Sequence, residues 1–504
     1  MKLLKTLALA AMLGCSIAAG AQTQATATPK HEFRGAWLHI IGQSQFAKMT
    51  PAETRAYLTK QLDELKQTGV NAIIWQVRPQ ADAAYVSQIE PWSRWISGKA
   101  GVAPSPVWDP LQFMIDESHK RGMELHAWIN PYRVTSGKDD VPAKGHVYYQ
   151  HPEWFLKYAD GKIYFDPALP ESRDFICKVV KDMMTRYDID AIHMDDYFYP
   201  YPVTGKEFPD TASWKKYGAG WTSKGDWRRH NVDMLIDQVH EVMQSIKPWV
   251  RLGISPFAIW RNKASDVNGS DTRGLQCYDA LYADCPAWTR AGWVDYMVPQ
   301  LYWALEHKTA STSVLINWWN TQANGRHMYY GYAVRNCMDH TDTQNPAIAS
   351  QLERKVAMSR ELPNVHGVVW WPGYDVVRNY KGAKDSLVNK IMTAKAIVPA
   401  YTWLDSIAPA EVTALTAKRA GKNVRLSWKA PATSDPMQQA HFFVVYRFKA
   451  GEAINLGNAK AIVDITNATA YTAANAPRGR YTYVVTVLDR CNNESAQGAC
   501  VTVK

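Results

Sequence analysis

The chain has 504 residues, of which 46% are hydrophobic and 21% are charged. This length exceeds what one hydrophobic core normally organises, so we expect more than one domain. The net charge of +10 comes from dispersed lysines and arginines. No basic run resembles a nucleic-acid-binding arm, so no nucleic-acid partner is expected. The 21 Trp and 26 Tyr are numerous, but aromatic rings fill cores as well as bind sugars, so composition alone identifies no ligand.

The N-terminus predicts export. A short basic segment precedes an apolar run over residues 7–19, and the small residues at 19–21 fit a signal peptidase site. We therefore expect residues 1–21 to be a signal peptide and residues 22–31 to be a polar linker. A second interpretation is a lipoprotein signal, with a lipid anchor through Cys15. Both interpretations place the mature chain in the periplasm or cell envelope, and the second makes it an outer-membrane lipoprotein.

Export permits disulfides, and six cysteines follow the predicted signal peptide. Cys277 and Cys285 are close enough in the sequence to close a small loop, as are Cys491 and Cys500. The other two lie in a helical pattern and after a strand, where they can stay free. No Cys-x-x-Cys or Cys/His spacing indicates structural zinc.

Between residues 32 and 400 the chain alternates between two patterns. Apolar runs typical of buried parallel strands occur at residues 33–40, 71–77, 124–129, 191–195, 251–256, 296–302, 327–332 and 366–371. Segments of helical periodicity begin near Pro51, Asp109, Glu171, Asp226, Asp279, Thr312, Asn345 and Lys384. This alternation predicts an α/β fold, a (β/α)8 TIM barrel. The competing architecture is an open doubly wound sheet, which usually carries a glycine-rich first turn that residues 33–42 lack.

From residue 406 to residue 504 the pattern changes to alternating residues and turns. Antiparallel strands are expected at residues 424–428, 442–448, 462–465, 481–488 and 499–503. The placing of Trp428, Tyr446 and the run 481–489 resembles a fibronectin type III domain. We therefore expect a small all-β sandwich of that type after the barrel. It carries no cluster of catalytic residue types, which favours a spacer or docking role.

The active site of a TIM barrel lies at the carboxyl ends of its strands, and polar and aromatic residues gather there in this sequence. Candidate substrate-binding residues are Arg78, Asn130, Tyr132, His193, Tyr197, Gln300, Tyr302, Trp303, Trp371 and Asp375. We expect Arg78 to hold a carboxylate ionised or to bind an anionic sugar substituent. The amides would bind hydroxyl groups and the aromatic rings would stack on sugars. Any single aromatic residue can equally belong to the core.

The sharpest element is the end of the fourth strand, where His193, Asp195 and Asp196 follow one another closely. Side chains alternate along a strand, so His193 and Asp195 should both point toward the barrel axis. Asp196 begins the loop and can lean over the same opening. Glycoside cleavage needs two carboxyl groups, which makes Asp195 and Asp196 the candidate catalytic residues. The alternatives are that each aspartate only caps a loop or holds an arginine, and that His193 is a buried residue orienting Asp195.

The identity of the second carboxyl group stays open. Many barrel hydrolases carry a glutamate at the seventh strand, whereas residues 327–332 contain no carboxylate. Asp196 can supply the group if the turn brings both aspartates inward. Otherwise it must come from a loop, and the candidates are Glu306, Asp375, Asp82, Asp166 and Glu207.

Several of these motifs occur together in one family. They are Phe-Arg-Gly-Ala-Trp at 33–37, Gln-Val-Arg-Pro at 76–79, Trp-Ile-Asn-Pro at 128–131, residues 167–174, and the segment 192–200 that contains His-Met-Asp-Asp. Over roughly residues 31–400 the sequence resembles the glycosyl hydrolase-like 10 family. The resemblance implies an exported bacterial TIM-barrel glycosidase, and some relatives act on peptidoglycan strands stripped of their peptides. One departure is Asp166, where the family pattern has asparagine. The protein would bind a poly- or oligosaccharide, and no cofactor or metal is expected.

Three other functions stay open. A metal-dependent hydrolase or deacetylase would use His39, His126 and His193 with the two aspartates, although no His-x-His or His-x-x-x-His spacing occurs. A barrel that has lost its activity would bind glycans in the envelope without cleaving them. A hydrolase of dietary or capsular polysaccharide would differ only in its loops. The linkage cleaved, the stereochemistry, endo or exo action and the oligomeric state are not predicted.

Overall fold

The computed structural model describes residues 28–344 and 350–504. The predicted signal peptide, the proposed lipid site at Cys15 and most of the predicted linker lie outside the described residues, as does the helix start expected near Asn345. Within the described ranges, no helix has both the length and the apolar character needed to cross a bilayer.

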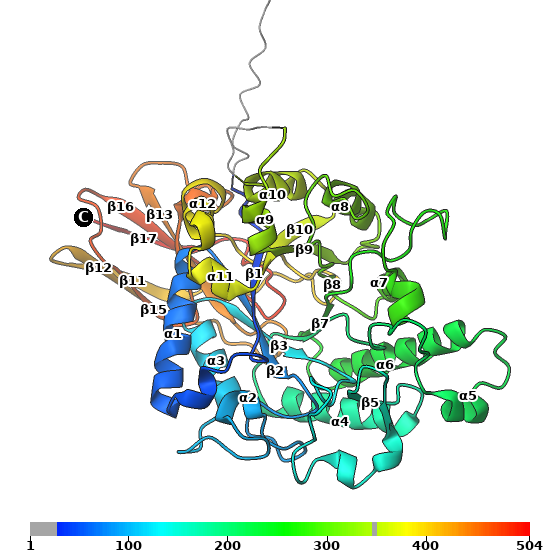
Figure 1. Cartoon of the computed structure of the whole chain (residues 1–504). Helices are drawn as coiled ribbons and strands as arrows, with labels where there is room; N and C mark the ends of the chain where they lie inside the picture. The colour runs from blue at the N-terminus through cyan, green and yellow to red at the C-terminus, as the bar shows by residue number, and fades with distance from the viewer. Residues whose placement is uncertain (1–27, 345–349) are drawn as a thin grey trace, which may run out of the picture.

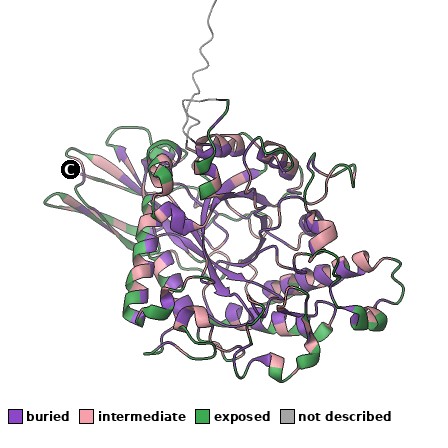
Figure 2. Ribbon diagram, viewed as in Figure 1, coloured by how far each residue is buried: buried purple, intermediate pink, exposed green. Residues whose placement is uncertain are grey.

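Eight parallel strands form a closed barrel in the order β1-β10-β9-β8-β7-β6-β3-β2 (Figure 1). They are β1 (Phe33–Leu38), β2 (Ala72–Arg78), β3 (Glu124–Ile129), β6 (Ala191–Met194), β7 (Arg251–Ile254), β8 (Tyr296–Met297), β9 (His327–Ala333) and β10 (Val365–Trp371). Each strand falls within or beside a predicted apolar run, so the TIM barrel is confirmed. The strands form the buried centre in Figure 2, and the helices around them keep their exposed faces outward.

The helices that cover the barrel begin with strong sequence signals. Proline occupies the first turn of α1, α3 and α4, where its missing N–H has no helical partner to lose. The main helices are α1 (Pro51–Gln67), α3 (Pro110–His119), α4 (Pro170–Arg186), α6 (Lys224–Ile246), α7 (Cys285–Ala291), α8 (Thr312–Asn320), α10 (Leu352–Arg360) and α12 (Ala383–Ser386). Shorter pieces lie in the loops: α2 (Arg94–Ser97), α5 (Thr211–Tyr217), α9 (Val334–Asp339), α11 (Gly373–Val377) and the hairpin β4 (Phe155–Lys157) with β5 (Ile163–Phe165).

The strands bury both of their faces, with different partners on each. On β6, Ile192 and Met194 belong to the core shared with the helices, whereas Ala191 belongs to a second core inside the barrel. Aromatic rings fill much of that interior, and Phe33 stacks on Tyr329 with ring centroids 4.1 Å apart. The barrel is therefore a packed core beneath its open end, as expected for this fold.

The C-terminal part consists of two antiparallel sheets. One contains β11 (Thr413–Ala420), β12 (Asn423–Lys429) and β15 (Ala470–Ala473), and the other contains β14 (Ile462–Thr466), β13 (Phe442–Lys449), β16 (Tyr481–Leu488) and β17 (Ala499–Val503). Trp428, Phe443 and Tyr483 pack in a core that both sheets share. The all-β sandwich is therefore confirmed, and its fibronectin type III character stays a prediction.

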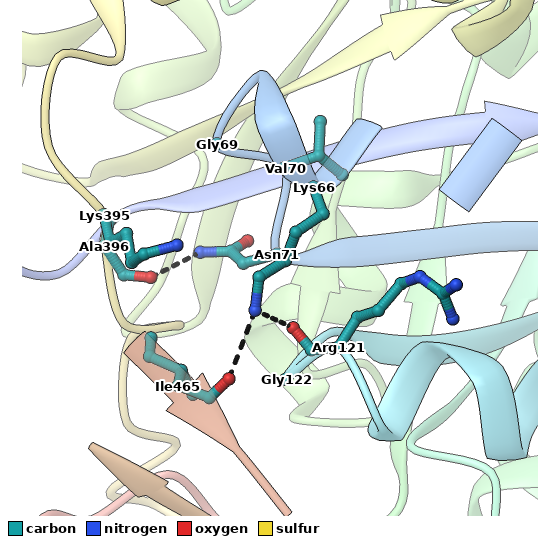
Figure 3. A pocket seen from close by; sticks show the side chains of 9 residues that line it. All are labelled: Lys66, Gly69, Val70, Asn71, Arg121, Gly122, Lys395, Ala396 and Ile465. Atoms are coloured by element: carbon teal, nitrogen blue, oxygen red, sulfur yellow. Dashed lines mark hydrogen bonds between the residues drawn. The ribbon is translucent and has the colours of Figure 1, made fainter. Parts of the chain in front are cut away.

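The sandwich packs against the barrel at the end where the strands begin, as the left side of Figure 1 shows. Lys66 bridges this junction, since its Nζ donates to the carbonyl oxygens of Arg121 and Ile465 (Figure 3). A Cβ on Gly122 would clash with the Ile465 carbonyl, so glycine permits the close approach of the two parts. The cavity that remains there measures about 20 Å³, room for a single water molecule.

All six described cysteines are free thiols, so neither predicted disulfide forms. Cys277 and Cys285 are buried neighbours, and burial followed by the Cys277 thiol raises the pKa of Cys285. Cys491 is buried in the sandwich, whereas Cys500 is exposed on the outer strand β17, which keeps the two thiols apart.

Candidate active site

A cavity of about 280 Å³ lies at the carboxyl ends of the barrel strands. Sites for small ligands typically measure about 300–1,000 Å³, so this cavity is just below the lower limit of that range. Its lining residues are Trp37, Ile41, Gln76, Trp128, Arg133, Asp195, Asp196, Tyr197, Tyr201, Ser255, Gln300, Tyr302 and Trp371. Residues from many different strands therefore meet in one place, as in other TIM-barrel sites.

Asp195 follows β6 directly and is only 4% exposed, yet it lines the cavity. Its Oδ2 accepts hydrogen bonds from Trp128 Nε1, at 3.2 Å, and from Asn130 Nδ2. Its Oδ1 accepts from the backbone N–H of Tyr197 at 3.3 Å. Three donors, one from β3 and two from the loops after β3 and β6, therefore fix the orientation of this carboxyl group.

Asp196 lines the same cavity and is held by a separate set of donors. Its Oδ2 accepts from the Tyr201 hydroxyl, and its Oδ1 accepts from Gln300 Nε2 at 3.2 Å. The turn after β6 thus brings both adjacent carboxyl groups to one cavity, the arrangement that two catalytic aspartates would require.

The two carboxyl groups perturb one another. Burial, and then the charge of Asp196, raise the pKa of Asp195 to about 7. Burial also raises the pKa of Asp196, against the hydrogen bonds from Tyr201 and Gln300. Neighbouring carboxylates in a buried site do not both ionise readily, so the pair keeps a shared proton until the pH rises to about 7.

Asn130 is oriented by its neighbours. Its Oδ1 accepts from Gln76 Nε2 at 2.8 Å and from Arg133 Nη2 at 2.9 Å. Because both partners are donors, the amide oxygen must face them and the amide nitrogen must face Asp195. Asn130 therefore donates a hydrogen bond to Asp195 from beneath the cavity surface and does not line the cavity itself.

Arg78 does not line the cavity. It is fully buried, and its Nη2 forms an ion pair with Glu90 Oε1 at 2.7 Å, while Nη1 donates to the carbonyl oxygens of Asn130 and Pro131. The cation on the cavity wall is Arg133, whose guanidinium lies 4.9 Å from the ring centroid of Tyr197. The arginine expected to meet an anionic substituent therefore comes from the loop after β3.

The other predicted substrate-binding residues divide into two groups. Those that line the cavity are Tyr197, Gln300, Tyr302 and Trp371. Those that lie elsewhere are Tyr132, fully buried in the core; Trp303, packed on Phe257; Asp375, paired with Arg335 and Arg378; and His193, buried inside the barrel. Sequence position cannot separate these groups, because all of them lie near the carboxyl end of a strand or in the loop after it.

The loop carboxylates proposed as a second catalytic group are engaged elsewhere. Glu306 pairs with Arg354, Glu207 with Lys224 and Arg228, and Asp375 with Arg335 and Arg378. Asp82 accepts from the backbone N–H of Gln80, and Asp166 accepts from Ser213 and from Ala168 N–H. Among the described residues that line the cavity, Asp195 and Asp196 are the only carboxylates.

The three histidines of the metal-site alternative do not converge. His39 contacts Gln43, whereas His126 and His193 each form a hydrogen bond with the Tyr296 hydroxyl. In the described part of the chain, the one His/Asp group with the spacing of metal ligands is His119, Asp190 and His441, at the junction with the sandwich. The residues of the cavity therefore do not fit the proposed metal centre.

Several cavity residues were not predicted as site residues: Trp37, Ile41, Gln76, Trp128, Arg133, Tyr201 and Ser255. Trp37, Gln76 and Trp128 lie inside β1, β2 and β3, one or two positions before the ends of these strands. Strand alternation could have identified them, since each points to the barrel interior near its open end.

Comparisons with known proteins show which proteins this chain resembles in sequence. The family model described as Glycosyl hydrolase-like 10 matches residues 32–348. Glycosyl hydrolase YngK of Bacillus subtilis is 36% identical over 485 residues, which cover 94% of this chain and 93% of that protein. Glycosyl hydrolase DigH of Escherichia coli K12 is 35% identical over 377 residues, which cover 69% of this chain and 84% of that protein.

Proposed function

Because the chain belongs to the glycosyl hydrolase-like 10 family and is a glycoside hydrolase, we propose that it is exported and cleaves peptide-free peptidoglycan strands through Asp195 and Asp196. The observation that carries this proposal is the meeting of both carboxyl groups in one cavity at the open end of the barrel. The apolar run and small residues before position 22 support export.

The protonation of the pair suits glycoside cleavage. One carboxyl group must protonate the oxygen of the leaving sugar while the other, ionised, attacks the anomeric carbon or activates water. A pair that keeps one shared proton until the pH rises to about 7 supplies both forms at once. Asp195 and Asp196 would therefore divide the acid and base roles between them.

The walls of the cavity favour a sugar ring. Trp37 and Trp128 lie beside Trp371, with ring centroids 6.3 Å and 6.0 Å from it. Trp371 is half-buried, so part of its ring faces the cavity. Tyr302 and Gln300 add a ring and an amide on the side of β8, which suits the apolar faces and hydroxyl edges of a sugar.

Arg133 favours an acidic glycan. Two of the five N–H groups of its guanidinium are used by Pro79 O and Asn130 Oδ1, and the side chain borders the cavity. A carboxylate on the sugar, such as the lactyl group of muramic acid, would find a fork-shaped partner there. Neutral dietary polysaccharides lack such a group.

The proposal is tested by incubating the mature protein and its Asp195→Asn variant with peptide-free peptidoglycan strands and with plant and capsular polysaccharides. Products are analysed by mass spectrometry. We expect oligosaccharides from peptidoglycan strands with the wild type, and at least a 100-fold lower yield with the variant, since acid–base groups contribute about 10²–10⁴-fold.

Asp375→Asn is the matched control, because Asp375 is as buried as Asp195 but lies outside the cavity. It should retain cleavage. Cleavage of a different polysaccharide would keep the enzyme and change the substrate. Binding without cleavage of any glycan by the wild type would support a barrel that has lost its activity.

A further inference from the structure

Beneath the cavity, a line of hydrogen bonds runs through the barrel interior. Trp37 Nε1 lies 3.2 Å from His193 Nε2, and His193 Nδ1 lies 3.1 Å from the Tyr296 hydroxyl. The same hydroxyl lies 2.7 Å from His126 Nδ1, and His126 Nε2 lies 2.9 Å from Glu124 Oε2. These five residues are at most 2% exposed, so no bulk water interrupts the line.

The hydrogen bond at the upper end shows the direction of this line in the wild-type protein. An indole N–H can only donate, so His193 Nε2 must be an acceptor and its proton must sit on Nδ1. That proton is donated to the Tyr296 oxygen, which leaves the Tyr296 hydrogen to be donated to His126 Nδ1. His126 must then carry its own proton on Nε2, facing Glu124.

The lower end enforces the same direction. Burial alone would raise the pKa of Glu124, but Arg251 and then the hydrogen bond from His126 outweigh it and hold that pKa below its usual value. Glu124 is therefore ionised and can only accept. Its other oxygen, Oε1, lies 2.5 Å from Arg251 Nη2 and accepts from Asn492 Nδ2 at 2.8 Å.

The sandwich supplies part of this lower end. Asn492 belongs to the turn after β16, and the carbonyl oxygen of Arg490 in the same turn accepts from Arg251 Nη1 at 3.2 Å. The turn therefore contacts both members of the Glu124–Arg251 pair. It orients the carboxylate that begins the line, at the opposite end of the barrel from the cavity.

We propose that Glu124, anchored by Arg251 and by Asn492 of the sandwich, is a positioning residue for the active site, because it sets the direction of the hydrogen-bond line that keeps His193 Nε2 an acceptor. The inference rests on the proposed function only for its effect on activity. His193 Nε2 lies 3.0 Å from Ser255 Oγ as well as near Trp37, and both of these residues line the cavity.

Reversal of the line would disturb the cavity. A proton on His193 Nε2 would face the N–H of Trp37, leaving two donors opposed at 3.2 Å in a buried site. Trp37 would have to move, and with it the wall that borders Trp371. Ser255 would be affected too, and its carbonyl oxygen holds Gln300, the donor to Asp196.

Glu124→Gln is the decisive variant, because it changes no volume. Arg251 can only donate, so the amide oxygen must stay with Arg251 and Asn492, and the amide nitrogen must face His126. His126 Nε2 becomes an acceptor, and each later bond reverses in turn. We expect His193 to move its proton from Nδ1 to Nε2, and kcat to fall about 10-fold with KM changed less than twofold.

The tautomer is read from a multiple-bond ¹H–¹⁵N spectrum of protein labelled at histidine, with the His193 signals assigned by their loss in His193→Gln. Tyr296→Phe is a second variant, which interrupts the line while keeping the ring. It should lower kcat about 10-fold and free the His193 tautomer. Tyr329→Phe is its control, since the Tyr329 hydroxyl is equally buried but bonds to Tyr401 outside the line.

An unchanged His193 tautomer in Glu124→Gln would overturn the proposal. An equal loss of activity in Tyr329→Phe would also overturn it, since the effect would then be general to buried hydroxyl groups. If the wild type cleaves no glycan, the proposed function fails, while the tautomer measurement still decides whether Glu124 sets the direction of the line.

Discussion

Gln300 connects Asp196 to the end of a neighbouring strand. Its Nε2 lies 3.2 Å from Asp196 Oδ1 and 2.9 Å from the carbonyl oxygen of Ser255. Gln300 follows β8, Ser255 follows β7 and Asp196 follows β6, so one amide joins three consecutive strand ends. The position of Asp196 therefore depends on the closure of the barrel as well as on its own loop.

The raised pKa of Asp195 predicts how activity depends on pH. A pKa of about 7 means that the pair loses its shared proton as pH rises through neutrality. Because the leaving sugar needs a proton donor, we expect kcat/KM to fall tenfold per pH unit above about pH 7. Initial rates between pH 4 and pH 9 on the substrate found by product analysis check this. A rate that stays level up to pH 9 would contradict it.

The same pKa predicts a pH-dependent stability effect of Asp195→Asn. An aspartate whose pKa is raised in the folded state binds its proton more tightly there, so its contribution is full below about pH 4 and is lost as pH rises through about 7. Asparagine does not titrate. As the pH rises from 5 to 8, the free energy of unfolding of the variant should therefore increase relative to that of the wild type, on the order of a few kcal/mol. Urea unfolding of both proteins at pH 5 and at pH 8 measures this. An equal difference in unfolding free energy between variant and wild type at both pH values would contradict it.

Arg133 should affect both substrate affinity and proton affinity. Arg133→Gln removes the cation that lowers the pKa of Asp195, so the alkaline limb of the activity profile should move to higher pH. KM for strands that contain muramic acid should rise about 10-fold, because a charge-assisted bond contributes about 1.5–3 kcal/mol. Arg133→Lys keeps the charge but loses the paired N–H groups that bind both oxygens of a carboxylate.

In Arg133→Lys we expect the pH profile to stay in place while KM still rises. The measurement compares KM on native strands with KM on strands whose lactyl carboxylates have been amidated. If Arg133→Gln raises KM equally for both, Arg133 does not bind the carboxylate.

Removal of Glu90 should destabilise the fold. Glu90 and Arg78 are almost completely inaccessible to solvent, and Glu90→Ala would leave the Arg78 guanidinium buried without its counterion. Breaking such a pair costs about 3–5 kcal/mol. Glu153→Ala is the control, because Glu153 is exposed and should change stability by less than about 0.5 kcal/mol. Urea unfolding of both variants tests the prediction, and equal effects would contradict it.

The barrel could be predicted because its strands bury both faces and so stand out as short apolar runs. β11 was missed for the opposite reason, since no residue in it is fully buried and it shows little apolar contrast. β15 was missed because four residues give too short a pattern.

The position of the two aspartates also followed from the sequence, since they come directly after a strand. The sequence could not show that Arg133, and not Arg78, borders the cavity. Arg78 is engaged by Glu90, and that contact depends on the path of the loop between them. The loop carboxylates likewise could not be sorted, because their salt-bridge partners are set by tertiary packing.

The junction between sandwich and barrel has a consequence for orientation. Lys30 pairs with Glu494 of the sandwich at 2.5 Å, and His31 bridges to Ile397, so the chain enters the barrel at its base. A molecule held by its N-terminus would thus turn its cavity away from the point of attachment. If Cys15 carried a lipid, the 13 peptide steps to Thr28 would reach at most about 45 Å. The cavity would then face away from the membrane. The enzyme would reach only the glycan that lies within a short distance of the membrane surface.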